Sequence, residues 1–222
     1  MSEPADNYED VSVFGLDDAD EQALLLGHNE CTFIWSNKEG WPVGVIMSYV
    51  FREGKFWLTA SGQRARISAV RRDPRVCVVV TSTGSPIPRN KAITWKGNCT
   101  VHDSDGPEFD ALKAWFYRDL SEAIRPGDVP GQTLFAKFLD SPRRVILEVD
   151  PVQRIGYDGA KMGKATAEWV ASQSSTVVAV CRSCRLRTPL SPTHRCNSTT
   201  TCVDDKRDSP WRQKDPEIMS PS

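Results

Sequence analysis

Short apolar runs separated by polar turns follow one another along most of the chain up to residue 157. The runs are rich in β-branched and aromatic residues, which predicts strands, and the turn at 52–54 predicts a hairpin between two of them. The run at 76–81 is apolar throughout, as is typical of a strand buried on both faces. Gly97 interrupts a long run and predicts a bulge or a close approach of two backbones. The expected strands are residues 31–35, 43–51, 56–60, 76–81, 92–102, 144–150 and 153–157.

Helices are expected in four places. The first has Asp17 as its N-cap and Gly27 as its stop, and a short one begins near Arg64. Two more are expected at residues 107–124 and 132–139. Because short strands are joined by tight turns with few helices between them, the pattern favours an antiparallel barrel over a parallel, doubly wound sheet. We therefore predict a mainly β fold with flanking helices.

The composition changes sharply near residue 170. Residues 171–222 contain fifteen Ser or Thr, five Pro and one aromatic residue. Such a segment buries too little apolar surface to offset the entropy lost on ordering. We predict a flexible N-terminus at 1–13, one domain at 14–170 and a disordered tail at 171–222.

The charges are balanced, with 28 Lys and Arg against 29 Asp and Glu and a net charge of −1. This balance, without a broad basic stripe, argues against a nucleic-acid partner. No apolar run approaches the roughly 18 residues of a membrane span, and the acidic first ten residues do not resemble a signal peptide. We expect no membrane partner and a cytoplasmic protein whose seven cysteines are reduced.

The candidate chemistry lies in residues 56–75 (FWLTASGQRARISAVRRDPR), where a strand gives way to a short helix. The first N–H groups of a helix are unsatisfied donors that carry partial positive charge. Arg64 and Arg66 add guanidinium groups at that same end, where cations are unfavourable unless an anion is bound. We interpret these two arginines as an anion site. The three that follow, Arg71, Arg72 and Arg75, are interpreted as a solvated face.

The run TASGQRARISAVRRDPRV resembles the phosphate-binding stretch of the pyridoxamine 5′-phosphate oxidase-like, FMN-binding split-barrel family. Members have a strand ending in Thr, a short polar turn, a basic element and a helix that runs into Asp-Pro-Arg. The spacing from Arg66 to Pro74 matches that pattern, with Arg66 where the family usually has Lys. The resemblance covers roughly residues 16–162 and favours the branch whose members hold FMN or the deazaflavin cofactor.

This resemblance implies an antiparallel six-stranded split β-barrel that forms a homodimer, with a flavin in each of two clefts at the dimer interface. It implies that Arg64 and Arg66 hold the phosphate of the cofactor, with FMN favoured and the deazaflavin cofactor as the alternative. The residues implied to assist the phosphate, or to line and approach the flavin ring, are Met47, Ser48, Tyr49, Thr59, Ala60, Gln63, Trp95 and Lys96. Val45 stands where the oxidase has a cofactor-binding cation, and the C-terminal Trp and Arg-x-His elements of the oxidase are missing. Vitamin B6 phosphate is therefore not the implied substrate.

Two other patterns carry less weight. Cys181-x-x-Cys184 has the residue types of a zinc site, with His194, Cys196 and Cys202 downstream, but its spacing fits no standard site. Residues 159–164 (GAKMGK) resemble a phosphate loop, yet Ala165 replaces the hydroxyl residue that would bind Mg²⁺. We predict no metal site.

The sequence thus favours a flavin-dependent oxidoreductase that transfers hydride to or from a small organic substrate. It identifies no catalytic acid or base. The alternatives are a deazaflavin-dependent reductase, a non-catalytic flavin-binding protein, and a haem-binding split barrel with an axial ligand from His28 or His102.

Overall fold

The computed structural model describes residues 11–85, 87–88, 90–103, 106–181, 194–196 and 202–204. The chain divides into two units, Met1–Ser172 and Gln173–Ser222, which are described separately here.

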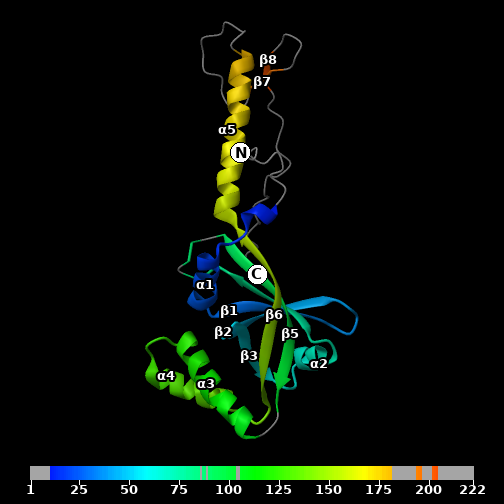
Figure 1. Ribbon diagram of the computed structural model, residues 1–222, viewed down its shortest axis with the longest axis vertical. Coiled ribbons are helices and arrows are strands. Elements are labelled where there is room, and N and C mark those ends of the chain that lie inside the picture. Colours follow the sequence, from blue (N-terminus) through cyan, green and yellow to red (C-terminus); the bar gives the residue numbers. More distant parts are fainter. Residues whose placement is uncertain are drawn as a thin grey trace, which may run out of the picture. The chain divides into compact units, whose positions relative to one another are not determined.

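Six antiparallel strands of the first unit close into a barrel, so the predicted fold class is confirmed (Figure 1). Around the barrel the strands follow the order β1-β2-β3-β6-β5-β4. Each expected run forms a strand, although the two runs expected at 144–150 and 153–157 are parts of one continuous strand. The bounds are β1 Glu30–Ser36, β2 Pro42–Arg52, β3 Lys55–Ser61, β4 Arg75–Thr81, β5 Lys91–His102 and β6 Arg144–Asp158.

The barrel interior is the main hydrophobic core. Alternate side chains of each strand point inward, as the burial of every second residue in β1, β3 and β4 shows. Helices α1 (Asp18–Gly27) and α2 (Ala65–Arg72) add buried residues to the same core. Its largest fully buried side chains include Phe33, Tyr49, Phe56, Leu24, Leu58, Ile67, Ile93 and Leu147.

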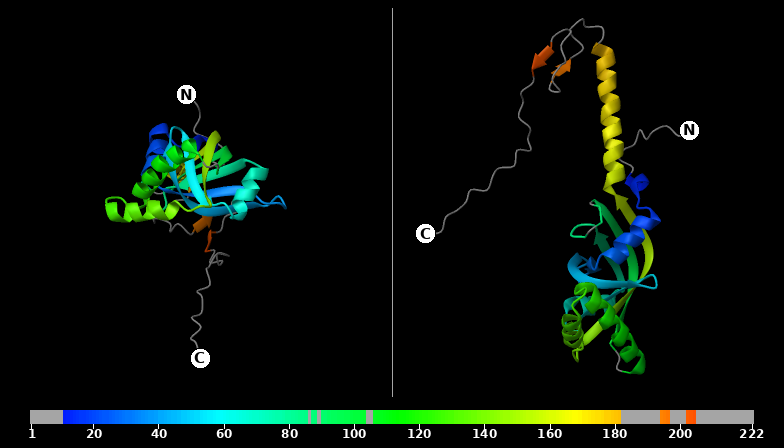
Figure 2. Two further views of the ribbon diagram at one scale, coloured as in Figure 1. Left: turned by 90° about the horizontal axis from the view of Figure 1, so that it is seen from below. Right: turned by 90° about the vertical axis from the view of Figure 1, so that its left-hand side faces the viewer.

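Helices α3 (Pro107–Ile124) and α4 (Val129–Leu139) cover part of the outer surface of the barrel. Phe116 and Leu120 of α3 pack with Leu139 of α4 and Ile146 of β6 in a second core cluster. Helix α4 begins three residues before the predicted position. Its start is set by Asp128, whose side chain accepts a hydrogen bond from the N–H of Gly131 (3.0 Å), and by a proline in the first turn. Figures 1 and 2 place α2 and the α3–α4 pair on opposite sides of the barrel.

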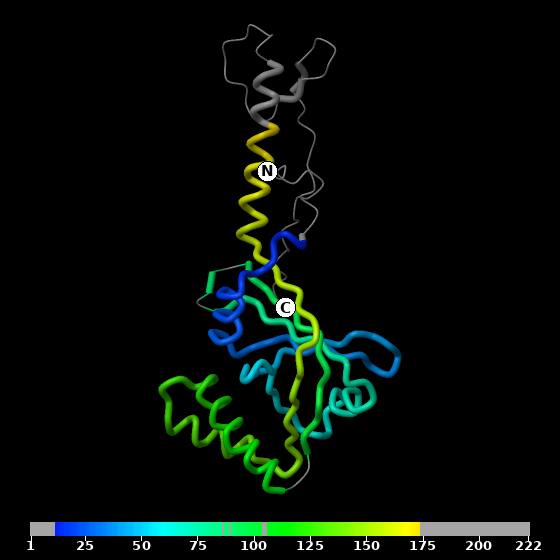
Figure 3. Tube along the Cα trace, in the orientation of Figure 1, coloured from blue at the N-terminus to red at the C-terminus, as the bar shows by residue number. Residues whose placement is uncertain are grey.

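Strand β6 runs beside β5 over the whole length of β5, as the chain trace in Figure 3 shows. Their register shifts between Lys96 and Gly97, and Pro151 of β6 lies opposite the shift. This irregularity lets β6 continue through a proline that has no N–H to donate. The bulge or close approach predicted at Gly97 is therefore confirmed.

Helix α5 (Gly159–Cys181), which the sequence pattern did not predict, runs from the first unit into the second. In the second unit, β7 (His194–Cys196) pairs with β8 (Cys202–Asp204) in an antiparallel ladder. The remainder of the predicted tail, including Cys184, and residues 1–10 of the predicted N-terminus lie outside the described residues. Disorder of the tail stays a prediction. Among the described helices, none is long and apolar enough to cross a membrane.

Candidate functional site at the start of helix α2

The predicted anion site lies where β3 ends and α2 begins. After Ser61 the chain turns, and the N–H of Arg64 donates to the Ser61 carbonyl oxygen (3.0 Å). The N–H of Gly62 donates to the carbonyl oxygen of Arg143 at the start of β6 (2.7 Å). A β-carbon on Gly62 would lie 3.3 Å from that same oxygen, so a small residue lets the turn sit close to β6.

Helix α2 begins without a side-chain cap. Its N-cap residue is Arg64, which has extended backbone and whose side chain makes no capping hydrogen bond. The first turn of α2 contains no acidic residue, whereas Ile67 and Val70 on its inner face are buried in the core. Cationic side chains therefore stand at the positive end of a helix, an arrangement that an anion would stabilise.

Arg66 is the central residue of this arrangement. Its Nε is buried and, within the described part of the chain, has no hydrogen-bond partner. Burial, and secondarily the charge of Arg64, lower the pKa of its guanidinium below the usual value. Within the part of the chain whose side chains are described, neither Arg64 nor Arg66 has an ion pair. A buried donor and two like charges without a counter-charge fit a bound anion.

The other arginines of the segment differ in this respect. Arg71 pairs with Asp103, Arg72 donates to the Ser36 carbonyl oxygen (3.0 Å), and Arg75 forms a two-pronged pair with Asp73. All three are exposed and satisfied by the protein itself. Their interpretation as a solvated face agrees with the structure. Arg64 and Arg66 differ from these three because they have no ion pair among the described side chains.

The residues expected to assist the phosphate lie beside the two arginines, but with their own contacts. The hydroxyl of Thr59 donates to the Val145 carbonyl oxygen (2.8 Å), so it is free to accept but already donates within the barrel. The methyl group of Ala60 points into the core. With the amide of Gln63 turned so that its oxygen faces Arg143, this oxygen accepts hydrogen bonds from Nε (3.2 Å) and Nη1 of Arg143.

The three residues expected to line the ring are consecutive in β2, and the strand separates them. Met47 and Tyr49 point into the barrel core, where the Tyr49 hydroxyl donates to the Leu25 carbonyl oxygen (2.9 Å). Ser48 lies between them on the outer face and is half-buried. Because successive side chains of a strand alternate between faces, one surface cannot present all three.

Trp95 and Lys96 of β5 alternate in the same way. Trp95 packs against the barrel core, and its buried indole Nε1 has no hydrogen-bond partner among the residues that the structure describes. Lys96 is exposed, and its Nζ donates to the side-chain oxygen of Gln153 on β6 (3.2 Å).

The sequence analysis did not identify Arg143. This arginine reaches the site because β3 and β6 pair with Ser61 opposite Arg144. Its carbonyl oxygen anchors the turn at Gly62, and its guanidinium contacts Gln63. Only the pairing of two strands separated by more than 80 residues places it there, and no local motif signals that pairing.

Comparisons with known proteins give the chain a family context. The model of the family described as pyridoxamine 5′-phosphate oxidase matches residues 19–156. No curated protein is similar enough in sequence to count as a match. Solved structures do match, among them a conserved hypothetical protein of Mycobacterium tuberculosis with 17% identity and a TM-score of 0.53. The match covers 67% of this chain and 88% of that one.

Two further structures are similar at a lower level. A FAD-binding protein of Mesorhizobium loti has 17% identity and a TM-score of 0.46, over 64% of this chain and 94% of that one. An F420 reductase has 17% identity and a TM-score of 0.45, over 60% of this chain and 94% of that one.

Proposed function

Because the chain belongs to the pyridoxamine 5′-phosphate oxidase family, we propose that it binds a flavin-type cofactor whose phosphate is held by Arg64 and Arg66. FMN is the first choice, and the deazaflavin cofactor is the alternative. The matched residues, 19–156, contain the whole β3–α2 segment and five complete strands of the barrel.

The observation that carries the proposal is the buried Nε of Arg66, which has no hydrogen-bond partner among the described residues. A phosphate group supplies both the acceptor atoms that this donor lacks and the negative charge that offsets Arg64 and Arg66. The first N–H groups of α2 add further donors at the same place. Gln63 and Arg143 form the neighbouring wall, whereas the Thr59 hydroxyl keeps its proton on the Val145 carbonyl oxygen.

We further propose that the protein is an oxidoreductase for a small organic substrate. When bound, the flavin would supply the hydride chemistry. The chain's own residues would bind the phosphate, orient the cofactor and shield it from water. Around Arg64 and Arg66 no described carboxylate or imidazole is paired with the arginines, so we assign no residue to proton transfer.

The proposal includes a homodimer. The barrel's own side chains fill its interior, which leaves no room inside for a flavin ring. A second copy would supply an apolar wall and would cover exposed apolar side chains such as Trp41 and Ile46, which are 70% and 74% exposed. We also propose a cytoplasmic location, since Cys31, Cys77 and Cys99 are free thiols, as is usual in a reducing compartment.

The absorbance spectrum of the purified full-length protein, before and after addition of FMN, tests the cofactor. A bound flavin or deazaflavin spectrum supports the proposal, whereas a Soret band would replace it by haem binding. Turnover with a reduced nicotinamide donor then distinguishes a flavin-dependent enzyme from a non-catalytic flavin-binding protein. A protein that binds FMN tightly but transfers no hydride to any acceptor would be a flavin-binding protein and not an enzyme.

A further inference from the structure

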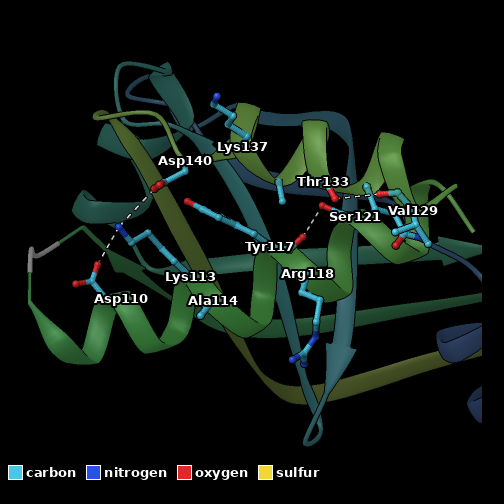
Figure 4. A pocket seen from close by; sticks show the side chains of 12 residues that line it. Asp110, Lys113, Ala114, Tyr117, Arg118, Ser121, Val129, Thr133, Lys137 and Asp140 are labelled. Carbon is cyan, nitrogen blue, oxygen red and sulfur yellow. Dashed lines mark hydrogen bonds and ion pairs between the residues drawn. The ribbon is translucent and has the colours of Figure 1, made fainter.

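Helices α3 and α4 line an open cavity of about 680 Å³ on the side of the barrel away from α2 (Figures 1 and 4). One face of each helix lines it, with positions three or four residues apart. Small side chains, among them Ala114, Ser121 and Ala136, keep the space between the helices open. The volume lies in the range of small-molecule sites.

Tyr117 of α3 presents a polar group that the protein does not satisfy. The residue is 5% exposed, and its hydroxyl is buried without a hydrogen-bond partner in the described part of the chain. The hydroxyl of Ser121, one turn further along α3, donates to the backbone carbonyl oxygen of Tyr117 and lies away from the phenol oxygen (Figure 4). In Figure 4 the Tyr117 ring lies between the two helices, with its hydroxyl end toward Lys113 and Asp140. A buried hydroxyl without a partner is unfavourable, and a ligand with an acceptor atom would relieve it.

The lining of the cavity carries charges of both signs. Lys113 lies 3.0 Å from Asp110 and 3.5 Å from Asp140, so its single positive charge faces two carboxylates and the three groups together carry one negative charge. Arg118 is paired with Asp119. Lys137 also lines the cavity and, among the described side chains, has no ion pair. Tyr117 and Lys137 each offer a donor to an acceptor that bears negative charge.

The walls favour an apolar body on that ligand. Ala114, Ala136 and Val129 face the cavity, and Val129 is 65% exposed. A carbon chain or a ring would cover these surfaces, and burial of apolar area would add to binding.

We propose that the cavity between α3 and α4 binds a small organic acid, with its carboxylate accepting a hydrogen bond from Tyr117 and its apolar part lying along Ala114 and Ala136. This site is separate from the phosphate site at α2 and does not depend on the proposed cofactor.

The test is calorimetric titration of the full-length protein with 4-phenylbutyrate and with 4-phenylbutylamine. These probes share a size and an apolar body but differ in the charged group. We expect the carboxylate to bind and the amine to bind at least tenfold more weakly. Tyr117→Phe removes only the hydroxyl and should weaken 4-phenylbutyrate about tenfold or more, the loss expected for one hydrogen bond to a charged acceptor. Tyr157→Phe, at another tyrosine hydroxyl, is the matched control and should bind normally.

Two further measurements test whether a loss of binding reflects a loss of folding and not a change in the cavity. Ala114→Phe should fill the cavity and abolish binding while the protein stays folded, because Ala114 is exposed. Tyr117→Phe should keep the melting temperature of the unsubstituted protein, since no hydrogen bond is lost. Absence of 4-phenylbutyrate binding, equal affinity of the amine, unchanged affinity of Tyr117→Phe, or a clear fall in its melting temperature would each overturn the proposal.

Discussion

A β-carbon on Gly97 would lie 2.6 Å from the carbonyl oxygen of Asp150, at the point where the register of β5 and β6 shifts. The same β-carbon would lie 2.8 Å from Cγ1 of Val149. Because one of these atoms belongs to the backbone of the neighbouring strand, any side chain at position 97 would push the two strands apart.

Gly97→Ala should therefore destabilise the barrel by about 1–3 kcal/mol, the usual cost of overpacking. Urea unfolding followed by circular dichroism measures it. Gly163→Ala is the control, because a β-carbon there meets nothing within 4 Å, and in a helix it should stabilise slightly. Equal stability of the two variants would show that β5 and β6 are not in close approach at Gly97.

Gly97 also illustrates what the sequence could predict. A glycine within a run of β-branched residues indicates a bulge or a close approach of two backbones. The lengths of the strands and the turns between them indicate the barrel class. The apolar spacing predicts a later start for α4 than the structure has, because the N-cap Asp128 and the proline of the first turn begin the helix before its first apolar repeat. The continuity of β6 through Pro151 depends on the bulge opposite it, which one strand's sequence does not reveal.

The candidate site was predicted in part for the same reasons. Arg64 and Arg66 are adjacent to a strand end and a helix start, so a local motif places them. Arg143 joins them only through the β3–β6 pairing. The alternation of side chains along β2 was available in the sequence, and it separates Ser48 from Met47 and Tyr49.

A half-buried carboxylate, that of Glu148, makes stability depend on pH. Glu148 accepts from Lys55 and lies 2.7 Å from Nε2 of His102. Burial alone would raise the pKa of Glu148, but the hydrogen bonds from Lys55 and His102 outweigh it and hold the pKa below the usual value of 4.5. The unfolded chain then takes up this proton at a higher pH than the folded chain, so the stabilisation is complete above 4.5 and is lost as the pH falls below it.

Glu148→Gln should thus lower stability near neutral pH, and the difference from the unsubstituted protein should shrink on acidification below that value. Melting temperatures across the acid range measure it, with Glu122→Gln on the exposed face of α3 as the control. A difference that stays constant with pH would mean that the Glu148 carboxylate contributes no pH-dependent stability.

The second unit is expected to be dispensable for the first. A chain ending at Ser172, the last residue of the first unit, should melt within about 2 °C of the full-length protein and bind FMN equally well. Differential scanning calorimetry and metal analysis test this together. A large loss of stability, or one zinc ion per full-length chain, would assign a structural role to the cysteines of the C-terminal segment.

The proposed dimer predicts a mass and a dependence on concentration. Light scattering after size exclusion should report about twice the 24.8 kDa of one chain, and flavin should be released on dilution into the monomer range. Ile46→Asp on the outer face of β2 should favour the monomer, whereas Leu26→Asp, at an equally exposed position of α1, should not. A monomer that binds FMN at full affinity would contradict this arrangement.

The central claim is that Arg66 and Arg64 hold the phosphate of the cofactor, and fluorescence titration of FMN against paired variants tests it most directly. Arg66→Ala should weaken binding by about 1.5–3 kcal/mol, which is roughly 10- to 150-fold, because it removes a charge-assisted hydrogen bond. The weakening should diminish as salt screens the charge. Arg75→Ala removes an arginine that is already paired with Asp73 and should bind FMN normally. If the double variant Arg64→Ala/Arg66→Ala binds FMN as tightly as the unsubstituted protein, the phosphate is held elsewhere and the account is wrong.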